Sequence, residues 1–155
     1  LSKKTLTTLI VCAFLVNNTS NLKQWRQWIW QTCKNSYKQA NIAILLCNED
    51  EAAQFNHDYR NKNYATNVLS FALNEGESMY LPDCSELNGD LIFCPSVIEK
   101  ETADQHKSVI AHYAHLTVHG VLHLMGYDHI DDDEAEMEAL EIRILHQLGY
   151  TIPIY

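Results

Sequence analysis

One short stretch of the chain, residues 119–129, constrains its fold and its chemistry more than any other. It carries histidines at positions 119, 123 and 129, spaced by four and then six residues. Residues four apart lie one above the other on the same face of a helix, so His119 and His123 can bind one metal ion together. Gly126 can end this helix, because glycine adopts the left-handed conformation at little cost. The chain can then turn and bring His129 to the same ion.

Three histidine ligands with a fourth position left open are typical of a catalytic zinc site, whereas structural zinc sites are closed by four protein ligands. Two histidines on one helix face are more often polar surface or hydrogen-bonded core residues. Here leucine, valine and methionine surround them, unlike on a solvated face. The stretch therefore predicts one Zn²⁺ ion bound by His119, His123 and His129. Nickel and copper also suit three imidazoles, so the residues alone leave the metal open.

The predicted zinc site indicates hydrolysis, since such an ion lowers the pKa of a bound water to about 7. Zinc peptidases of the His-Glu-x-x-His type use the glutamate as general base, but Gly120 stands at that position. A metallopeptidase thus stays open as the weaker alternative. Zinc deaminases need His-x-Glu and Cys-x-x-Cys, and the chain has neither.

Three further residues are candidates for catalysis. Phosphodiester cleavage needs positive charge at the phosphate, and Arg60, on a polar turn before a predicted strand, is the best candidate. An ordinary surface ion pair is the plainer interpretation of Arg60. His115 extends the histidine face and can donate a hydrogen bond, take a proton or bind the metal, or simply be a satisfied polar residue. Asp128 can orient an imidazole, as carboxylates do at zinc sites, or cap the turn.

Charge and cysteine usage set limits on the partners and the compartment. The net charge of −9 argues against a general nucleic-acid binder. Residues 1–62 hold eight Lys and Arg against four Asp and Glu, whereas residues 63–155 hold three against sixteen, so a local anion-binding surface is possible. Five cysteines without a Cys-x-x-Cys predict reduced, mostly buried thiols in a cytoplasmic protein. The apolar run near the N-terminus is too short to span a membrane.

The hydrophobic pattern predicts one domain over residues 1–155, with about four strands and about five helices. The expected fold is α+β, or a three-layer α/β arrangement, with the metal site on a central helix packed against a mixed sheet. Residues 72–89 form the longest expected loop, a candidate lid or substrate contact. The predicted strands cover residues 5–16, 42–47, 66–71 and 90–94, and the predicted helices cover residues 22–37, 48–59, 95–103, 106–125 and 131–148.

The motifs resemble those of the bacterial YbeY family of endoribonucleases. His119-Gly120-x-Leu122-His123-Leu124-x-Gly126-Tyr127-Asp128-His129 is similar to the histidine signature of that family. The resemblance runs from about residue 42 to the end. Three residues depart from the family pattern: Asn61 where Gly is frequent, Asn67 where many members carry Asp, and Ala72 where Pro is frequent. Further matches are Tyr59-Arg60 with Thr66–Phe71, Gly89–Ile92, Ala114-His115, and the acidic run Asp131–Met137.

The resemblance implies a cytoplasmic, zinc-dependent endoribonuclease that acts on single strands. It implies a role in ribosomal RNA maturation, especially at the 3′ end of the small-subunit RNA, and in ribosome quality control. It also implies His119, His123 and His129 as zinc ligands and Arg60 as a substrate or catalytic residue. The expected partners are ribosomal RNA and the small ribosomal subunit, with no membrane. A ribosome-assembly factor with a structural metal is the non-catalytic alternative, and the sequence leaves the oligomeric state open.

Overall fold

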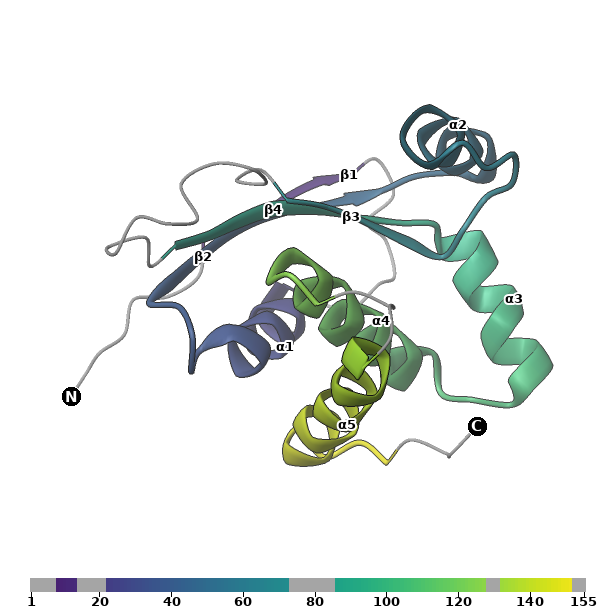
Figure 1. The fold of residues 1–155 in the computed structure, drawn as a ribbon. Coiled ribbons are helices and arrows are strands. Elements are labelled where there is room, and N and C mark those ends of the chain that lie inside the picture. The colour runs from purple at the N-terminus through teal and green to yellow at the C-terminus, as the bar shows by residue number, and fades with distance from the viewer. Residues whose placement is uncertain (1–7, 14–21, 73–85, 128–131, 152–155) are drawn as a thin grey trace.

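The chain folds into a mixed β-sheet covered by helices on both faces (Figure 1). A computed structural model describes residues 8–13, 22–72, 86–127 and 132–151. The predicted α+β class, with about four strands and five helices, is confirmed for this part of the chain. In chain order the elements are β1 (Thr8–Ala13), α1 (Leu22–Cys33), β2 (Gln39–Leu46), α2 (Glu49–Arg60), β3 (Val68–Ala72), β4 (Glu86–Phe93), α3 (Pro95–Gln105), α4 (Val109–Leu124) and α5 (Asp132–Gln147).

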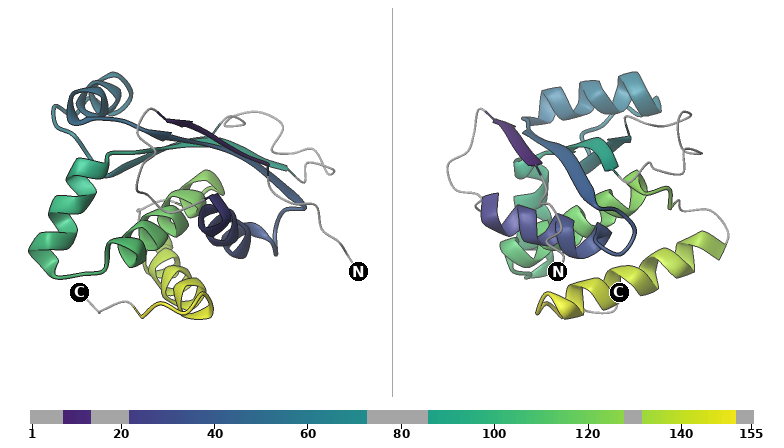
Figure 2. Two further views of the ribbon diagram at one scale, coloured as in Figure 1. Left: turned by 180° about the vertical axis from the view of Figure 1, so that it is seen from behind. Right: turned by 90° about the vertical axis from the view of Figure 1, so that its left-hand side faces the viewer.

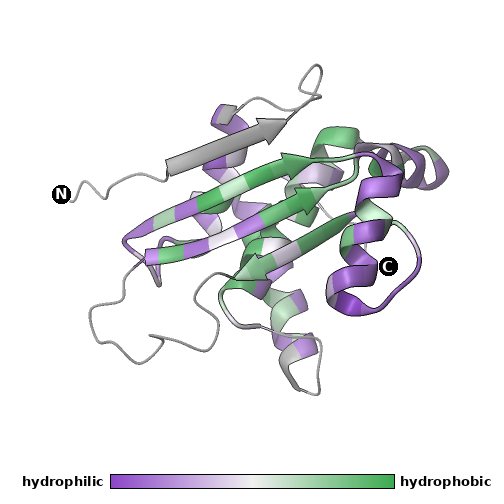
Figure 3. Ribbon diagram, turned by 90° about the horizontal axis from the view of Figure 1, so that it is seen from above, coloured by the Kyte–Doolittle hydropathy of each residue, from purple (hydrophilic) through white to green (hydrophobic). Residues whose placement is uncertain are grey.

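The sheet has the strand order β1-β2-β4-β3. Strands β1, β2 and β4 are parallel, and β3 pairs antiparallel with β4. Because β3 has only β4 as a partner, it forms an edge of the described sheet. Figure 3 shows that β2 and β4 both begin with hydrophilic residues and end with hydrophobic ones. At the hydrophilic end, the Asn41 side-chain amide donates a hydrogen bond to Asn88 Oδ1 at 2.9 Å.

The helices form layers around the sheet (Figures 1 and 2). Helix α2 covers one face, α1 and α4 cover the other, and α5 packs on the side of α4 that points away from the sheet. Trp25 and Trp28 of α1 are almost fully buried in the core. Trp25 packs against Phe93 and Tyr113, and its indole N–H donates to Thr117 Oγ1.

Several predicted element ends were wrong, and local hydrogen bonds explain the differences. The predicted helix from His106 begins instead at Val109, because Ser108 accepts a hydrogen bond from the backbone of Ala111 and caps it. His106 has a left-handed backbone that ends α3. Strand β4 begins at Glu86, within the predicted loop, and residues 73–85 of that loop lie outside the described part.

Gly126 ends α4, as predicted, and Gly149 ends α5. Both have positive φ, at 108° and 97°. After α4, Gly126 N–H donates to the carbonyl of His123, and Tyr127 N–H donates to that of Leu122. This pair of bonds defines the Schellman motif, which satisfies the last carbonyls of a helix. The turn directs the chain away from α4 just after His123.

Two glycines allow α4 to lie directly on the sheet. A Cβ at Gly120 would lie 2.8 Å from Leu91 Cδ2, and one at Gly89 would lie 2.7 Å from Leu124 Cδ2. At Gly89 the backbone oxygen of Phe71 is also only 2.9 Å away. The Ser70 hydroxyl donates across this contact to the Gly120 carbonyl at 3.2 Å. The position of α4 relative to β3 and β4 is therefore tightly defined.

The predicted burial and reduced state of the cysteines are confirmed for the three cysteines whose side chains the structure describes. Cys33, Cys47 and Cys94 are buried free thiols. Burial raises the pKa of Cys33 and of Cys47 to about 12, so both remain protonated at neutral pH. Among the described residues, no helix has the length and apolar character needed to cross a bilayer.

We expect Gly89→Ala to destabilise the fold by about 1–3 kcal/mol, because the added methyl group meets a backbone oxygen that cannot move freely. In an open strand position the same change would instead be mildly stabilising. Urea unfolding, followed by circular dichroism, measures the difference in free energy. A Gly89→Ala protein as stable as the wild type would contradict the close contact.

Candidate metal centre

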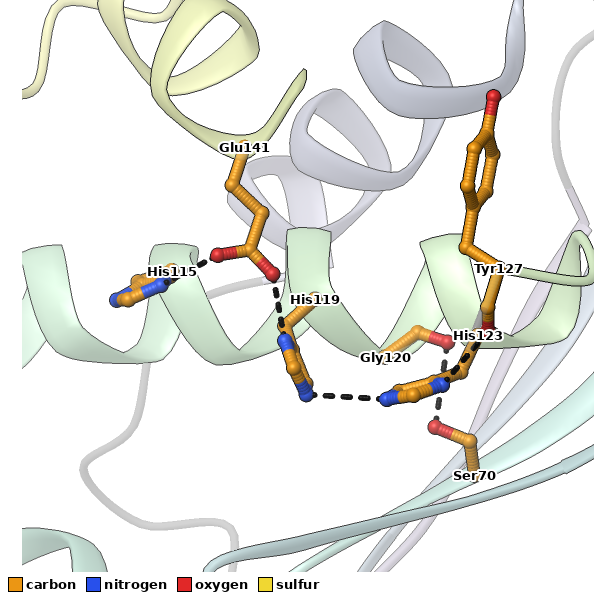
Figure 4. A network of polar contacts seen from close by, with 7 residues as sticks. All are labelled: Ser70, His115, His119, Gly120, His123, Tyr127 and Glu141. Atoms are coloured by element: carbon orange, nitrogen blue, oxygen red, sulfur yellow. Dashed lines mark hydrogen bonds and ion pairs between the residues drawn. The ribbon is translucent and has the colours of Figure 1, made fainter. Parts of the chain in front are cut away.

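The residues of α4 that face away from the core form one stripe. From Ala111 to Leu124, only positions 111, 115, 119 and 123 are partly exposed, and all the others are buried. Because these positions are four residues apart, the histidines of this stripe lie one above another on the helix. The Nε2 atoms of His119 and His123 are 3.1 Å apart (Figure 4). The structure thus brings together two of the three predicted zinc ligands.

Hydrogen bonds to the other ring nitrogen orient both imidazoles. His119 Nδ1 lies 2.5 Å from Glu141 Oε2, and His123 Nδ1 lies 3.0 Å from the carbonyl oxygen of Tyr127. A carbonyl and an ionised carboxylate only accept hydrogen bonds, so in both rings Nδ1 carries the proton. In the neutral rings, both Nε2 atoms therefore present lone pairs to each other.

This arrangement fits a zinc ion. Two facing lone pairs at 3.1 Å repel each other unless they share a positive charge, either a proton or a metal ion. Zinc–nitrogen bonds of 2.0–2.1 Å in tetrahedral geometry would place two ligand nitrogens about 3.3 Å apart. Hydrogen bonding of Nδ1 to a carboxylate or carbonyl is also what histidine ligands of zinc usually show. His119 and His123 could thus hold such an ion with little movement.

The remaining predicted residues of the motif, Asp128 and His129, lie outside the described residues. Within the described part of the chain, no three His, Cys, Asp or Glu side chains are grouped so that they could hold one metal ion. The assignment of His129 as the third ligand and the role of Asp128 stay predictions.

Glu141 on α5 belongs to the site, although sequence reasoning missed it. Its side chain is only 4% exposed. Burial by itself raises the pKa of this carboxyl, but hydrogen bonds from His115 and His119 outweigh burial and lower the pKa to about 2. The carboxylate is therefore ionised at neutral pH. A sequence signal existed, because Glu141 interrupts the apolar stripe that Met137, Ile144 and Leu145 form on this helix.

His115 reaches the site through Glu141. Its Nε2 lies 3.1 Å from Glu141 Oε1, while the other carboxylate oxygen faces His119 (Figure 4). The sequence left open whether His115 donates a hydrogen bond, takes a proton or binds the metal. The structure shows a hydrogen bond to Glu141. In this arrangement His115 holds Glu141 in place, and a direct catalytic role stays a prediction.

A cavity of about 1000 Å³, here called the strand-edge cavity, runs along β3 and reaches the two histidines. Every residue from Thr66 to Ala72 lines it, together with His119, His123 and Arg60. Arg60 is the last residue of α2, so its predicted place on a polar turn was wrong. Asn61 ends the helix with φ 58°, a left-handed conformation that Asn tolerates and Gly favours. Arg60 thus lies at the end of α2, where it lines the same cavity as the histidines.

A second cavity of about 360 Å³, here called the acidic cavity, also reaches His119. Of the charged residues that the structure describes, four glutamates and one lysine line the acidic cavity, whereas Arg60 and Glu86 line the strand-edge cavity. The acidic cavity thus repels a phosphate group more strongly than the strand-edge cavity does, and Arg60 offers the phosphate a positive charge in the strand-edge cavity. The four glutamates are Glu101, Glu134, Glu138 and Glu141, and the lysine is Lys107.

The family model and the sequence relatives that match this chain carry the same description. A family model described as Endoribonuclease YbeY matches residues 14–149. Endoribonuclease YbeY of Neisseria meningitidis is 55% identical over 132 residues, which cover 84% of this chain and 77% of that protein. Endoribonuclease YbeY of Xanthomonas oryzae is 48% identical over 130 residues, covering 83% and 81%. The solution structure of a Thermotoga maritima protein is similar in fold, with TM-score 0.63, 21% identity, and coverage of 91% and 89%.

We expect Glu141→Gln to weaken zinc binding about 10–100-fold, because the charged acceptor that orients His119 is lost. Competition with a chelating dye measures the affinity, and circular dichroism checks the fold. Glu136→Gln is the matched control, since it removes the same charge from an exposed position of the same helix. Equal zinc affinity of Glu141→Gln and wild type would contradict a positioning role for this carboxylate.

We expect Gly120→Glu to unfold the protein rather than create a peptidase. The residue is buried and faces Leu91, so a carboxylate there would be forced between α4 and the sheet. An unpaired buried charge costs at least about 3 kcal/mol. Urea unfolding and casein digestion test this, with Gly120→Ala as the milder comparison. A stable Gly120→Glu protein that digests casein would restore the metallopeptidase alternative.

Proposed function

Since the chain belongs to the YbeY endoribonuclease family, we propose that it cleaves RNA by hydrolysing phosphodiester bonds with zinc. One observation carries the proposal. Arg60 and the two metal-binding histidine candidates come from different helices, yet they line the same strand-edge cavity. A cation beside a metal site is what an anionic substrate requires, and a peptide bond would not need it.

The proposed ligands are His119, His123 and His129, with one zinc ion. When bound, zinc supplies a Lewis acid and lowers the pKa of water, so that a nucleophile is available at neutral pH. The chain's own residues supply orientation and charge. Glu141 fixes the ring of His119, and the Arg60 guanidinium binds the phosphate and stabilises the charge that develops on it. His115 keeps Glu141 in position.

The proposed substrate is single-stranded ribosomal RNA, near the 3′ end of the small-subunit RNA, and the proposed roles are rRNA maturation and ribosome quality control. The small ribosomal subunit is the proposed partner and the cytoplasm the proposed compartment. The charge distribution supports an RNA backbone that enters along β3, because the acidic cavity, which also reaches His119, repels phosphates. The buried reduced thiols are consistent with the cytoplasm.

We expect zinc-loaded protein to nick single-stranded ribosomal RNA and to leave casein intact. Chelation and His119→Ala should each abolish nicking, since both remove the metal. Arg60→Ala should keep zinc and fold but slow cleavage about 10²–10³-fold, because transition-state charge is no longer stabilised. Gel assays with parallel metal analysis measure both effects. Lys62→Ala is the control, since Lys62 is exposed near Arg60 but does not line the strand-edge cavity.

The outcomes separate the alternatives. Cleavage that survives both chelation and His119→Ala would contradict a zinc-dependent mechanism. An Arg60→Ala protein that cleaves at the wild-type rate would remove Arg60 from the reaction. Wild-type protein that binds zinc and ribosomal RNA but never nicks the RNA would favour an assembly factor with a structural metal.

A further inference from the structure

Tyr59 is the most exposed large hydrophobic residue in the described part of the chain. The residue is 66% exposed and lies in the last turn of α2. The ring packs edge-on against Phe71, with centroids 4.8 Å apart and an angle of 63° between the planes. Phe71 thus supports Tyr59 from one side, and a large part of the ring remains open to solvent.

Both aromatic rings line the strand-edge cavity. Tyr59 and Phe71 are part of its wall, together with Arg60 and the two histidines. Successive residues of β3 point to opposite faces: Ser70 contacts α4, whereas Phe71 packs with the residues beneath α2. The cavity therefore continues around the edge strand, from the histidines on one face to Tyr59 on the other.

The exposed ring of Tyr59 does not serve the hydrophobic core. The side chains that form the core below α2 are Cys47, Ala52, Leu69 and other residues, and Tyr59 is not among them. Exposing an aromatic ring to water is unfavourable, and a base that covers it would recover this free energy. Aromatic rings beside a cation are the usual means by which proteins hold unpaired bases next to their phosphates.

We propose that Tyr59, supported by Phe71, stacks on an unpaired base of the RNA strand and thereby helps to select single strands. This inference rests on the proposed endoribonuclease function and deepens it. Arg60, the next residue, is placed to bind a phosphate of the same strand. Tyr59 and the histidines lie on different faces of β3, so the stacked base belongs to a nucleotide displaced from the cleaved bond. In a duplex, each base is already paired and stacked, and Tyr59 has nothing to bind.

The test compares single-turnover cleavage of a short single-stranded RNA by zinc-loaded wild type, Tyr59→Leu and Tyr59→Phe. Tyr64→Leu is the matched control, because Tyr64 is 59% exposed but does not line the strand-edge cavity. Stacking on one base is worth about 1–3 kcal/mol, so Tyr59→Leu should raise the half-saturating protein concentration about tenfold or more. The maximum rate and the zinc content should not change. Tyr59→Phe and Tyr64→Leu should behave like wild type.

A set of RNAs with one base removed at successive positions locates the stacked base. One position should weaken binding to wild type as much as Tyr59→Leu does, and the same RNA should bind Tyr59→Leu with no further loss. Unchanged half-saturation for Tyr59→Leu, or identical losses with both proteins at every position, would overturn the stacking role. A wild-type protein that neither binds nor cleaves the intact RNA would instead overturn the proposed function itself.

Discussion

Helix α4 lies in direct contact with the sheet, and this contact sets the position of the metal centre and of the cavity beside it. At Gly89 and Gly120 the two backbones approach so closely that a methyl group on either glycine would collide with its neighbours. The Ser70 hydroxyl then connects β3 directly to the backbone of α4. Because α4 lies this near to the edge strand, the histidine stripe opens onto the cavity that runs along β3. A bulkier contact would move the histidines away from Arg60.

The second determining interaction is electrostatic. A buried carboxylate without partners would cost several kcal/mol, and Glu141 avoids this cost through hydrogen bonds from two imidazoles. The same bonds fix the tautomer of His119 and direct its Nε2 toward His123. The geometry of the metal centre thus depends on how α5 packs against α4, although α5 supplies no predicted ligand within the described residues.

The placement of charge reconciles an acidic protein with an anionic substrate. The net charge is −9, yet among the described residues one arginine and one glutamate line the strand-edge cavity, while four glutamates line the acidic cavity. Long-range attraction is therefore weak, and binding must depend on contacts made inside the cavity. Arg60 and the aromatic rings beside it are the groups suited to such contacts.

The features that were predictable from the sequence are those set by neighbouring residues along the chain. The helical spacing of His119 and His123 and the helix end at Gly126 follow from periodicity and backbone preference, which act over a few residues. Element ends such as those near His106 and Glu86 were misplaced, because caps and strand pairing compete there with the hydrophobic pattern. Short-range patterns were enough to predict the class of fold, the family motifs and the candidate ligands. The orientation of His119 by Glu141, and the cavity that Arg60 and Tyr59 share with the histidines, emerged from the folded chain, because these contacts join residues far apart in the sequence.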